Sequence, residues 1–472
     1  MRAPDTVREA TSENLDPRIA TILGSISLVD KLIAKIDQHV ASCVDAILHH
    51  PAFQALEAAW RGLKFVVDSV EPGRSVKIDV WWCSKSELQM DLEDNIDRTK
   101  STFFQIVYSG EYGQHGGVPY RAVFACFPIS STPPDMALLR GVAAVAAMAH
   151  APIFVDADPR LFGVSSFQEL RGDLRAIFGA PRLQKWNEFR TAEDSKYVGV
   201  LLPKMQLRLP YRDAELHLPF GAAGDDDEPS FIYNERIQDV NDLLWGSATY
   251  AFATRLADSH VRFGTAMGLV GTSDALPPAR DWHRAMNGDA LKPPVDVVFS
   301  HDLEVSLAAH GFIPLTSDPI HCTFRFSSAN SLQKPKIFGG EHGPQDTRNY
   351  FMATQMPYLL FACPFAHVIK LTQREIAGSH QSVESIARIL TASLKPYQNS
   401  NPSRALALKY PLREAQVEVI ELPWQPEWYA IRILLWPHMT YKGVDIGLAL
   451  PGKLERNPRQ RLSGAHAQGG RP

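Results

Sequence analysis

The stretch RAVFACFPISSTPPDMALLRGVAAVAAMAHAPIFV (residues 121–155) sets the architecture that we expect for this chain. It contains a predicted strand at Arg121–Phe127, an Ala-rich helix at Asp135–Ala149 and a second short strand at Ile153–Val155. Two consecutive prolines precede the helix, and proline suits the first turn because its missing N–H would have no helical partner there. Strands that alternate with helices predict an α/β or mixed α+β core.

Upstream of this stretch, the chain predicts two helices and a strand. Apolar residues recur at helical spacing from near Ser27, and His50-Pro51 ends this helix and starts a second one that reaches Val67. After a Glu-Pro-Gly turn, the residues of Ser75–Trp82 alternate between apolar and charged. This alternation is typical of a half-buried strand.

Downstream, further helices are predicted at Phe167–Phe178, Asp242–His260 and Ser382–Ser393. Between Arg212 and Glu228 the chain becomes polar and acidic, which indicates an exposed loop between sub-structures. No internal repeat is visible in the chain.

The region from Ala415 to Leu450 has a different pattern, in which apolar residues alternate with polar ones along three short runs. This predicts a three-stranded antiparallel unit. The basic, Gly-rich tail Lys453–Pro472 is expected to be disordered. The alternating apolar positions are Val417, Val419, Ile431, Ile433, Leu435, Val444, Ile446 and Leu448.

Composition excludes several classes of protein. The 472 residues suggest roughly two to four domains. With 45% hydrophobic and 21% charged residues, the chain is neither disordered, collagen-like nor a coiled-coil rod. The net charge of −4 implies no attraction to nucleic acid or to anionic lipid.

The cellular location follows from the cysteines and from the apolar segments. The 5 cysteines are widely spaced, which fits reduced thiols rather than a disulfide framework. The N-terminus has no signal-peptide pattern, and no segment approaches the roughly 18 apolar residues that a membrane span needs. We therefore expect a cytoplasmic protein with no membrane contact.

A search for catalytic motifs finds no phosphate-binding loop of the G-x-x-x-x-G-K-[ST] type, no G-x-G-x-x-G, no G-x-S-x-G and no H-E-x-x-H. Three weaker features remain: the glycine-rich loop Gly110–Gly117, the acidic run Asp225–Glu228 and the pair His49-His50. For each, a structural turn, a solvated loop or a helix end is favoured over a phosphate or metal site. No catalytic, cofactor-binding or metal-binding residue is predicted.

The C-terminal hairpin Tyr429–Leu450 is the feature that points to a partner. A long strand edge is either blunted or paired with another chain. From the residues alone, pairing with another chain and completion of this chain's own sheet have similar weight.

Several long blocks resemble the large subunit of the type VI secretion contractile sheath, the TssC family, also called VipB, ImpC or EvpB. The resemblance covers about residues 28–450. The blocks are IDQHVASCVDAILHHPAFQALEAAWRGLKFVV (36–67), VYSGEYGQHGGVPY (107–120), HAPIFVDADPRLFG (150–163), KWNEFRTAEDSKYVGVLLPKMQLRLPY (185–211), LLWGSATYAFATRLADS (243–259), GFIPL (311–315), SLQKPK (331–336) and PFAHVIK (364–370).

The resemblance implies a structural protein without an enzymatic activity or a cofactor. In that family, large and small (TssB/VipA type) subunits pair and polymerise with further copies of themselves around a tube of Hcp type. The sheath grows from a baseplate, contracts to drive the tube into a target cell, and is taken apart by an AAA+ unfoldase of ClpV type. C-terminal strands are exchanged between protomers, which would make the eight alternating residues above the partner interface.

The resemblance also divides the chain into four parts: residues 1–26 as a segment read by the unfoldase, 27–345 as the main sheath region, 346–452 as the C-terminal domain and 453–472 as the tail. The expected unfoldase contacts are Ile19, Ile22, Leu23 and Ile26, around a Gly24 that costs a helix about 1 kcal/mol. A divergent sheath paralogue, a phage-tail-like sheath protein and, remotely, an enzyme with a phosphate-binding loop at Gly110–Gly117 remain as alternatives.

Overall fold

The computed structural model describes residues 17–70, 76–95, 97–114, 116–171, 173–211, 233–270, 283–284, 291–318, 323–340, 347, 350–376, 382–400, 410–421, 428–438 and 448–455. The expected acidic run and most of the expected C-terminal tail lie outside these residues. The chain divides into two compact units. One comprises Met1–Ala58 with Arg208–Leu244, and the other comprises Ala59–Leu207 with Trp245–Pro472.

The first unit is built on the long helix α1 (Pro17–Leu48), with the start of α2 (Pro51–Asp68). Helix α1 begins well before Ser27, where the sequence predicted its start, and it continues through Gly24. The boundary predicted between residues 26 and 27 therefore falls inside a helix. The penalty of a single glycine is small compared with the cooperative gain of a continuous helix.

A buried ionic network holds the first unit together. The Arg208 guanidinium contacts the carboxylates of Glu57 at 2.8 Å and Glu235 at 2.5 Å. The Glu235 side chain has no exposed surface and also accepts a contact from His49 at 3.1 Å. A carboxylate this deeply buried requires such partners, because burying an unpaired charge is costly. The sequence alone had suggested only a dipole interaction for His49.

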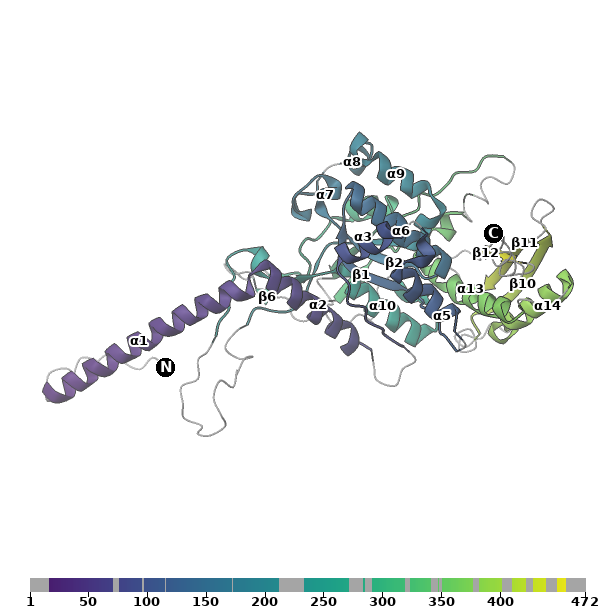
Figure 1. Cartoon of the computed structure of the whole chain (residues 1–472). Helices are drawn as coiled ribbons and strands as arrows, with labels where there is room; N and C mark the ends of the chain where they lie inside the picture. The colour runs from purple at the N-terminus through teal and green to yellow at the C-terminus, as the bar shows by residue number, and fades with distance from the viewer. Residues whose placement is uncertain are drawn as a thin grey trace, which may run out of the picture. The chain divides into compact units, whose positions relative to one another are not determined.

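The second unit contains a five-stranded sheet in the order β1-β2-β3-β8-β9 (Figure 1). Within this sheet, β1, β2, β3 and β8 are parallel, and β9 runs antiparallel to β8. The parallel strands are joined by helical connections, as the sequence predicted for an α/β or mixed α+β core. The strands are β1 (Val123–Ile129), β2 (Ile153–Ala157), β3 (Val198–Leu202), β8 (Phe312–Asp318) and β9 (Thr323–Phe326).

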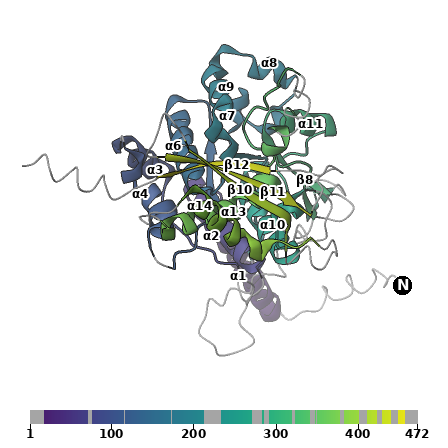
Figure 2. The same ribbon diagram turned by 90° about the vertical axis from the view of Figure 1, so that its right-hand side faces the viewer.

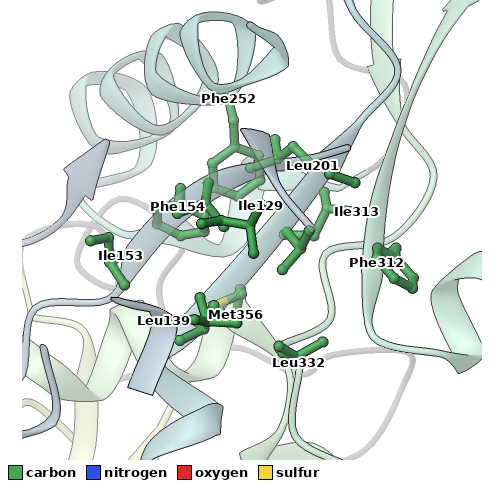
Figure 3. Packing of buried hydrophobic residues seen from close by; sticks show 14 of the residues in the cluster. Ile129, Leu139, Ile153, Phe154, Leu201, Phe252, Phe312, Ile313, Leu332 and Met356 are labelled. Atoms are coloured by element: carbon green, nitrogen blue, oxygen red, sulfur yellow. The ribbon is translucent and has the colours of Figure 1, made fainter. Parts of the chain in front are cut away.

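Helices cover both faces of this sheet. Phe252 of α10 (Ala248–Phe263) packs on one face, where its ring lies 4.6 Å from that of Phe154 (Figure 3). Leu139 and Met356, from α6 (Pro133–Ala149) and α13 (Met356–Ile376), approach the other face. The predicted Ala-rich helix corresponds to α6, whose small residues permit close approach to the strands.

Shorter elements complete the described chain. They are α3 (Lys85–Asp94), α4 (Thr102–Phe104), a π-helical turn at Gln105–Ser109, α5 (Gly110–Tyr112), α7 (Pro159–Phe162), α8 (Leu174–Phe178), α9 (Gln184–Thr191), β4 (Met205–Gln206), β5 (Trp245–Gly246), β6 (His283–Arg284), β7 (Leu291–Lys292), α11 (His301–Ala309), and 3-10 turns at Arg98–Lys100, Phe167–Glu169, Pro181–Leu183, Glu193–Tyr197, Val240–Asp242, Ala266–Leu269 and Lys395–Tyr397.

Three predicted elements were wrong. Residues 76–83 form no strand, because no described strand pairs with them. The helix predicted at Phe167–Phe178 is split into a 3-10 turn and α8, each of which begins at its own side-chain cap. The helix predicted from Asp242 begins at Ala248, because Ser247 caps it after the short strand β5.

The predicted antiparallel C-terminal unit is confirmed. Strands β10 (Leu412–Glu421), β11 (Trp428–Pro437) and β12 (Leu448–Glu455) form one sheet in that order. Helix α14 (Val383–Leu394), predicted at Ser382–Ser393, packs against β10 (Figure 2). Strand β12 runs to Glu455, so the first residues of the expected disordered tail belong to the sheet.

Candidate assembly interface

The C-terminal sheet has one buried face. Ile431 and Leu435 of β11 are 1% and 0% exposed, and Val417 of β10 is 6% exposed. They pack in a cluster with Leu390 of α14 and Phe361 of α13. The alternation of apolar residues along β10 and β11 therefore serves this chain's own core.

The opposite face of the sheet is largely polar along β10 and more apolar along β11. Glu414 and Gln416 of β10 are exposed, and Glu418 pairs across the strands with Arg432 at 3.9 Å. An exposed ion pair at this distance contributes little stability. On the same face, the residues of β11 opposite β10 include the half-buried Leu434 and Trp436. This face is therefore a mixed surface, more exposed than the face on the core.

The strand edges are the part of the sheet that another chain can use. Strand β11 is central, so β10 and β12 form the edges. Leu412, at the start of β10, is covered by a bridge to Gln398 and by the amide of Asn399, which donates to its carbonyl at 2.9 Å. From Val417 to Glu421, no described strand pairs with the outer edge of β10. No described strand pairs with the outer edge of β12 either.

The structure places six of the eight predicted interface residues. Val417, Ile431, Ile433 and Leu435 are buried in the chain's own core, Val419 packs partly against it, and Leu448 begins β12. Val444 and Ile446 lie outside the described residues. The four buried side chains are not available to a partner in this form, so any strand addition here uses main-chain groups at the edges.

Helix α13 connects this sheet to the five-stranded sheet (Figure 1). Its Met356 and Cys363 pack in the large core around β1, β2 and β3. On the same helix, Phe361 and Phe365 pack in the smaller core under β10 and β11. One helix therefore belongs to both hydrophobic cores, and a displacement of the C-terminal sheet would be passed to the main body through it.

Side chains around the C-terminal end of α6 strengthen this connection. Three consecutive carbonyls of that end, at residues 148–150, accept hydrogen bonds: Lys370 donates to the first, Tyr112 to the second at 2.7 Å, and His367 contacts the third at 3.0 Å. The last carbonyls of a helix lack helical partners, and cations are favoured beside them. We call these three side chains and the carbonyls that they contact the α6 clamp.

Burial changes the titration of the α6 clamp. It lowers the pKa of Lys370 to about 8 and the pKa of His367 to about 4. The Lys370 ammonium also lies 5.1 Å and 5.5 Å from the ring centroids of Tyr108 and Tyr112. Burial likewise lowers the pKa of His150, which ends α6 in the left-handed conformation with φ of 50°. The two histidines are therefore neutral at pH 7.

Sequence reasoning missed the α6 clamp. His367 and Lys370 lie in the segment PFAHVIK, and Tyr112 in VYSGEYGQHGGVPY, both of which carry the family resemblance. Nothing in either segment indicates that it meets the other, because the ring of Tyr112 contacts His367 and Lys370, which lie more than 250 positions away in the chain. The one available signal was a Lys and a His at helical spacing in an otherwise apolar helix, where charged groups are rarely buried without partners.

Two of the weak candidates for chemistry, most of the glycine-rich loop and His49, lie in the described residues, and the acidic run does not. In the Gly110–Gly117 loop, the amide of Gly113 donates to Ser109 and that of Gly117 to Gln114. Those amides are engaged within the chain, as expected for a structural turn. Across the described ranges, no group of three or more His, Cys, Asp or Glu side chains gathers as a metal site would require.

Helix α1 presents a second surface. Leu28, Leu32, Ile33 and Ile36 are 46–62% exposed, although their spacing is that of a buried helix face. The predicted unfoldase contacts Ile19, Ile22, Leu23 and Ile26 lie on the same helix, and their side chains are not described. A continuous exposed apolar face of this kind indicates a protein partner.

Comparison with known proteins defines the class first. Residues 30–333 match the VipB family, described as EvpB/VC_A0108, tail sheath N-terminal domain. Residues 345–454 match its companion, described as EvpB/VC_A0108, tail sheath gpW/gp25-like domain. Both matches place the chain in the class of tail sheath proteins.

A curated relative narrows this class. The chain is 32% identical over 443 residues to the type VI secretion system sheath protein TssC1 of Pseudomonas aeruginosa, covering 91% of this chain and 86% of that protein. The chain therefore belongs to the VipB family of type VI secretion sheath proteins, and it is a contractile sheath subunit.

Two solved structures of sheath proteins show distant likeness. The sheath tail protein Lin1278 from Listeria innocua is 10% identical, with a TM-score of 0.26 over 68% of this chain and 60% of that chain. The helical sheath of the anti-feeding prophage in its contracted state is 11% identical, with a TM-score of 0.29 over 70% of this chain and 67% of that chain. At these TM-scores the likeness supports no further inference.

None of the helices that the structure describes has the length and apolarity needed to cross a membrane.

Proposed function

We propose that this chain is the large subunit of a two-subunit sheath. It pairs with a small sheath subunit in the cytoplasm, polymerises around an inner tube from a baseplate, and contracts to propel the tube and spike into a target cell. The work comes from interfaces that repack between two arrangements, without catalytic chemistry in this chain. Membership of the type VI sheath family supports this proposal.

The observation that carries the pairing is the exposed apolar face of α1. Leu28 and Ile36 are 60% and 62% exposed, and Leu32 between them is 52% exposed. Leaving a large apolar side chain in water forfeits about 1.5–3 kcal/mol relative to burial, so a face of this length needs a cover. The cover in the proposal is the small subunit.

Contact between successive rings uses the edges of the C-terminal sheet. Strands of neighbouring subunits add to the outer edge of β10 and to β12 through main-chain hydrogen bonds. Such bonds hold while the bodies rotate, because they depend little on the side chains of either strand. Helix α13 then carries the displacement from the added strands to the main body.

Co-expression with the small sheath subunit, followed by negative-stain electron microscopy, tests the proposal. Hollow tubes are the expected result. A soluble pair without tubes would contradict polymerisation while preserving pairing, and the absence of any association would contradict both.

A pair of adjacent proline substitutions on β10 tests strand addition more directly. In an antiparallel strand, neighbouring N–H groups point to opposite sides, so one of Val419 and Ile420 donates to β11 and the other donates outward. Proline at the outward position should prevent long tubes while the chain stays folded, whereas proline at the inward position should destabilise the sheet. Normal tubes from both variants would contradict strand exchange at this edge. Ile433 is unsuitable for this test, because it pairs on both sides within the chain.

Recycling by an AAA+ unfoldase is proposed to use the first turns of α1. Replacing Ile22 and Leu23 by Ser should leave contracted sheaths intact in the presence of the unfoldase and ATP. The control replaces Ala10 and Thr11 by Ser, at positions that precede Pro17, where α1 begins. Unchanged disassembly would place the recognition elsewhere in the chain.

A further inference from the structure

Residues 76–83, between α2 and α3, have the sequence of a β-strand without a neighbouring strand. The segment VKIDVWWC is rich in β-branched and aromatic residues, which favour strands. The structure gives it no helix, turn, bend or bridge. Within the described part of the chain, no main-chain hydrogen bond joins residues 76–83 to any other residue. Since no described residue satisfies these donors and acceptors, they are available to water or to another chain.

Several large apolar side chains of this segment are exposed and could be covered by a partner. Val80 is 62% exposed, Trp82 is 70% exposed and Ile78 is 38% exposed. Trp82 stacks on Trp60 of α2, with ring centroids 6.0 Å apart, and Trp60 is itself 59% exposed. Two large aromatic rings stacked in water form an apolar patch of the kind found at protein interfaces.

The segment is nevertheless held in place by its other side chains. Trp81 stacks on buried Phe103 with ring centroids 6.0 Å apart, and the hydroxyl of Tyr120 donates to Asp79 at 2.9 Å. Just after the segment, the Lys85 ammonium donates to the carbonyl of Pro128 at 2.7 Å, on β1. Since β1 is an edge strand of the five-stranded sheet, these contacts tie the segment to the neighbourhood of an open sheet edge.

These features restrict what can cover the segment. A row of unpaired main-chain groups is satisfied by an extended strand, whereas a helix cannot match it. Lys77 and Asp79 pair with each other at 2.9 Å, so the segment has no net charge to attract a charged partner. The complementary chain is therefore a neutral β-strand with apolar residues at alternate positions.

We infer that the small sheath subunit supplies this strand: it adds to the main chain of residues 76–83 and covers Val80, Trp82 and Trp60. The inference rests on the proposed function, because it names a surface for the partner proposed there. It also accounts for the wrong strand prediction: the alternation of this segment encodes a strand that is completed only by a second polypeptide.

Amide hydrogen exchange tests the inference on the full chain, alone and with the small sheath subunit. In the complex, alternate amides of residues 76–83 should exchange at least about tenfold more slowly, since every second N–H points to the added strand. The chain alone should show no protection there at any concentration.

Variants separate main-chain from side-chain contributions. Val80→Pro removes a main-chain N–H that an added strand could use, because proline cannot donate to a strand ladder. Val80→Thr keeps both the N–H and the preference for a strand. Trp82→Lys removes the apolar patch, and Val305→Lys, at a site 56% exposed on α11, is the matched control. We expect Val80→Pro and Trp82→Lys to weaken association with the small subunit at least about tenfold and the two controls to leave it unchanged. The segment has no main-chain bonds to other described residues, and Val305 is exposed, so the thermal unfolding of the isolated chain should change little in Val80→Pro, Val80→Thr and Val305→Lys. In Trp82→Lys it should fall only by what the stacking on Trp60 contributes.

Each contrary outcome has a separate meaning. Association of the unaltered chain without protection of residues 76–83 overturns the inference and leaves the proposed function intact. Failure of the unaltered chain to associate overturns both. Protection in the isolated chain overturns the inference as well: if it grows with concentration, the strand comes from a second copy, and if it does not, from another segment of the same chain.

Discussion

The two sheets of the second unit differ in how many of their faces are covered. Every residue of β3 (Val198–Leu202) is buried, because α6 and α13 cover one face of the five-stranded sheet and α10 covers the other. Strand β10 instead alternates between buried and exposed residues, with helices on one face and water on the other. The continuous apolar run marks a strand inside a body, and the alternating run marks a strand at its surface.

The difference separates a sheet that is buried on both faces from a sheet that is buried on one face only. The five-stranded sheet is closed on both faces, so it has little to offer a partner except its edges. The C-terminal sheet is covered on one face by α14 and by α13, which also belongs to the main core, and no described strand pairs with the outer edge of β10 from Val417 to Glu421 or with that of β12. The proposed function uses both sheets, one as the body and the other as the site of contact between subunits.

The largest effect is expected from Phe154→Ala in the five-stranded sheet. Phe154 is fully buried, and its ring lies 5.3 Å from that of Phe124 and 4.6 Å from that of Phe252. Losing it should cost about 3–5 kcal/mol of unfolding free energy, measured by urea denaturation, and should weaken both sheets. Phe351→Ala, at a site 42% exposed, is the control and should cost much less. Equal losses from the two variants would contradict the view of this sheet as the rigid body.

A smaller and more local effect is expected from Ile431→Ala in the C-terminal sheet. Ile431 is 1% exposed and packs in the smaller core, so its truncation should cost about 2–4 kcal/mol. Hydrogen exchange should accelerate in β10 and β11 and stay slow in β2 and β3. Equal acceleration in both sheets would show that α13 joins them into one cooperative unit.

The junction between the sheets is tested by two neighbouring tyrosines. Tyr112→Phe removes the hydroxyl that donates to Ala149 and should cost about 1–2 kcal/mol, because that carbonyl loses its bond. The ring of Tyr108 stacks on that of Tyr112 with centroids 4.7 Å apart, and its hydroxyl makes no hydrogen bond to another described residue, so Tyr108→Phe should be nearly neutral. Urea denaturation measures both changes. Because both variants keep the ring, similar losses from the two would show that the hydrogen bond of the Tyr112 hydroxyl contributes nothing specific to the junction.

The smallest expected effect is a dependence of stability on pH at the same junction. The pKa of His367 is about 4 in the folded chain, against an ordinary value of 6.5. As the pH falls through this window the unfolded chain binds the proton first, so this contribution to stability is complete above 6.5 and is lost towards 4.

His367→Gln isolates this contribution, because its amide can still donate to the carbonyl of His150. Relative to this variant, the free energy of unfolding of the unaltered chain should fall by about 1 kcal/mol between pH 7 and about pH 5.5. Parallel pH profiles of unfolding free energy for the two proteins would mean that His367 titrates normally in the folded chain.

Much of the fold could be predicted from local pattern. The helix α14 and the strands β10 and β11 follow from periodicities that lie within one short segment. The helix at Asp242–His260 was placed too early, because the residues before Ser247 pair with Met205 and Gln206 as a short strand. The antiparallel C-terminal unit was predicted from its alternation, but its use by a partner stays a prediction, and four of the predicted contact residues are buried in the chain's own core.

The sequence by itself determined the family, the α/β or mixed α+β character and the one-sided C-terminal sheet, because these depend on motifs and on periods of two and 3.6 residues. Only the tertiary structure decided the order of the five strands, the sharing of α13 between two cores and the α6 clamp. Each of these joins segments far apart in the chain, and such contacts have no local signature. Residues 76–83 show the reverse case, in which a local signature is present without the element. Their pattern is that of a strand, but a strand forms only where a neighbouring strand satisfies its main-chain groups.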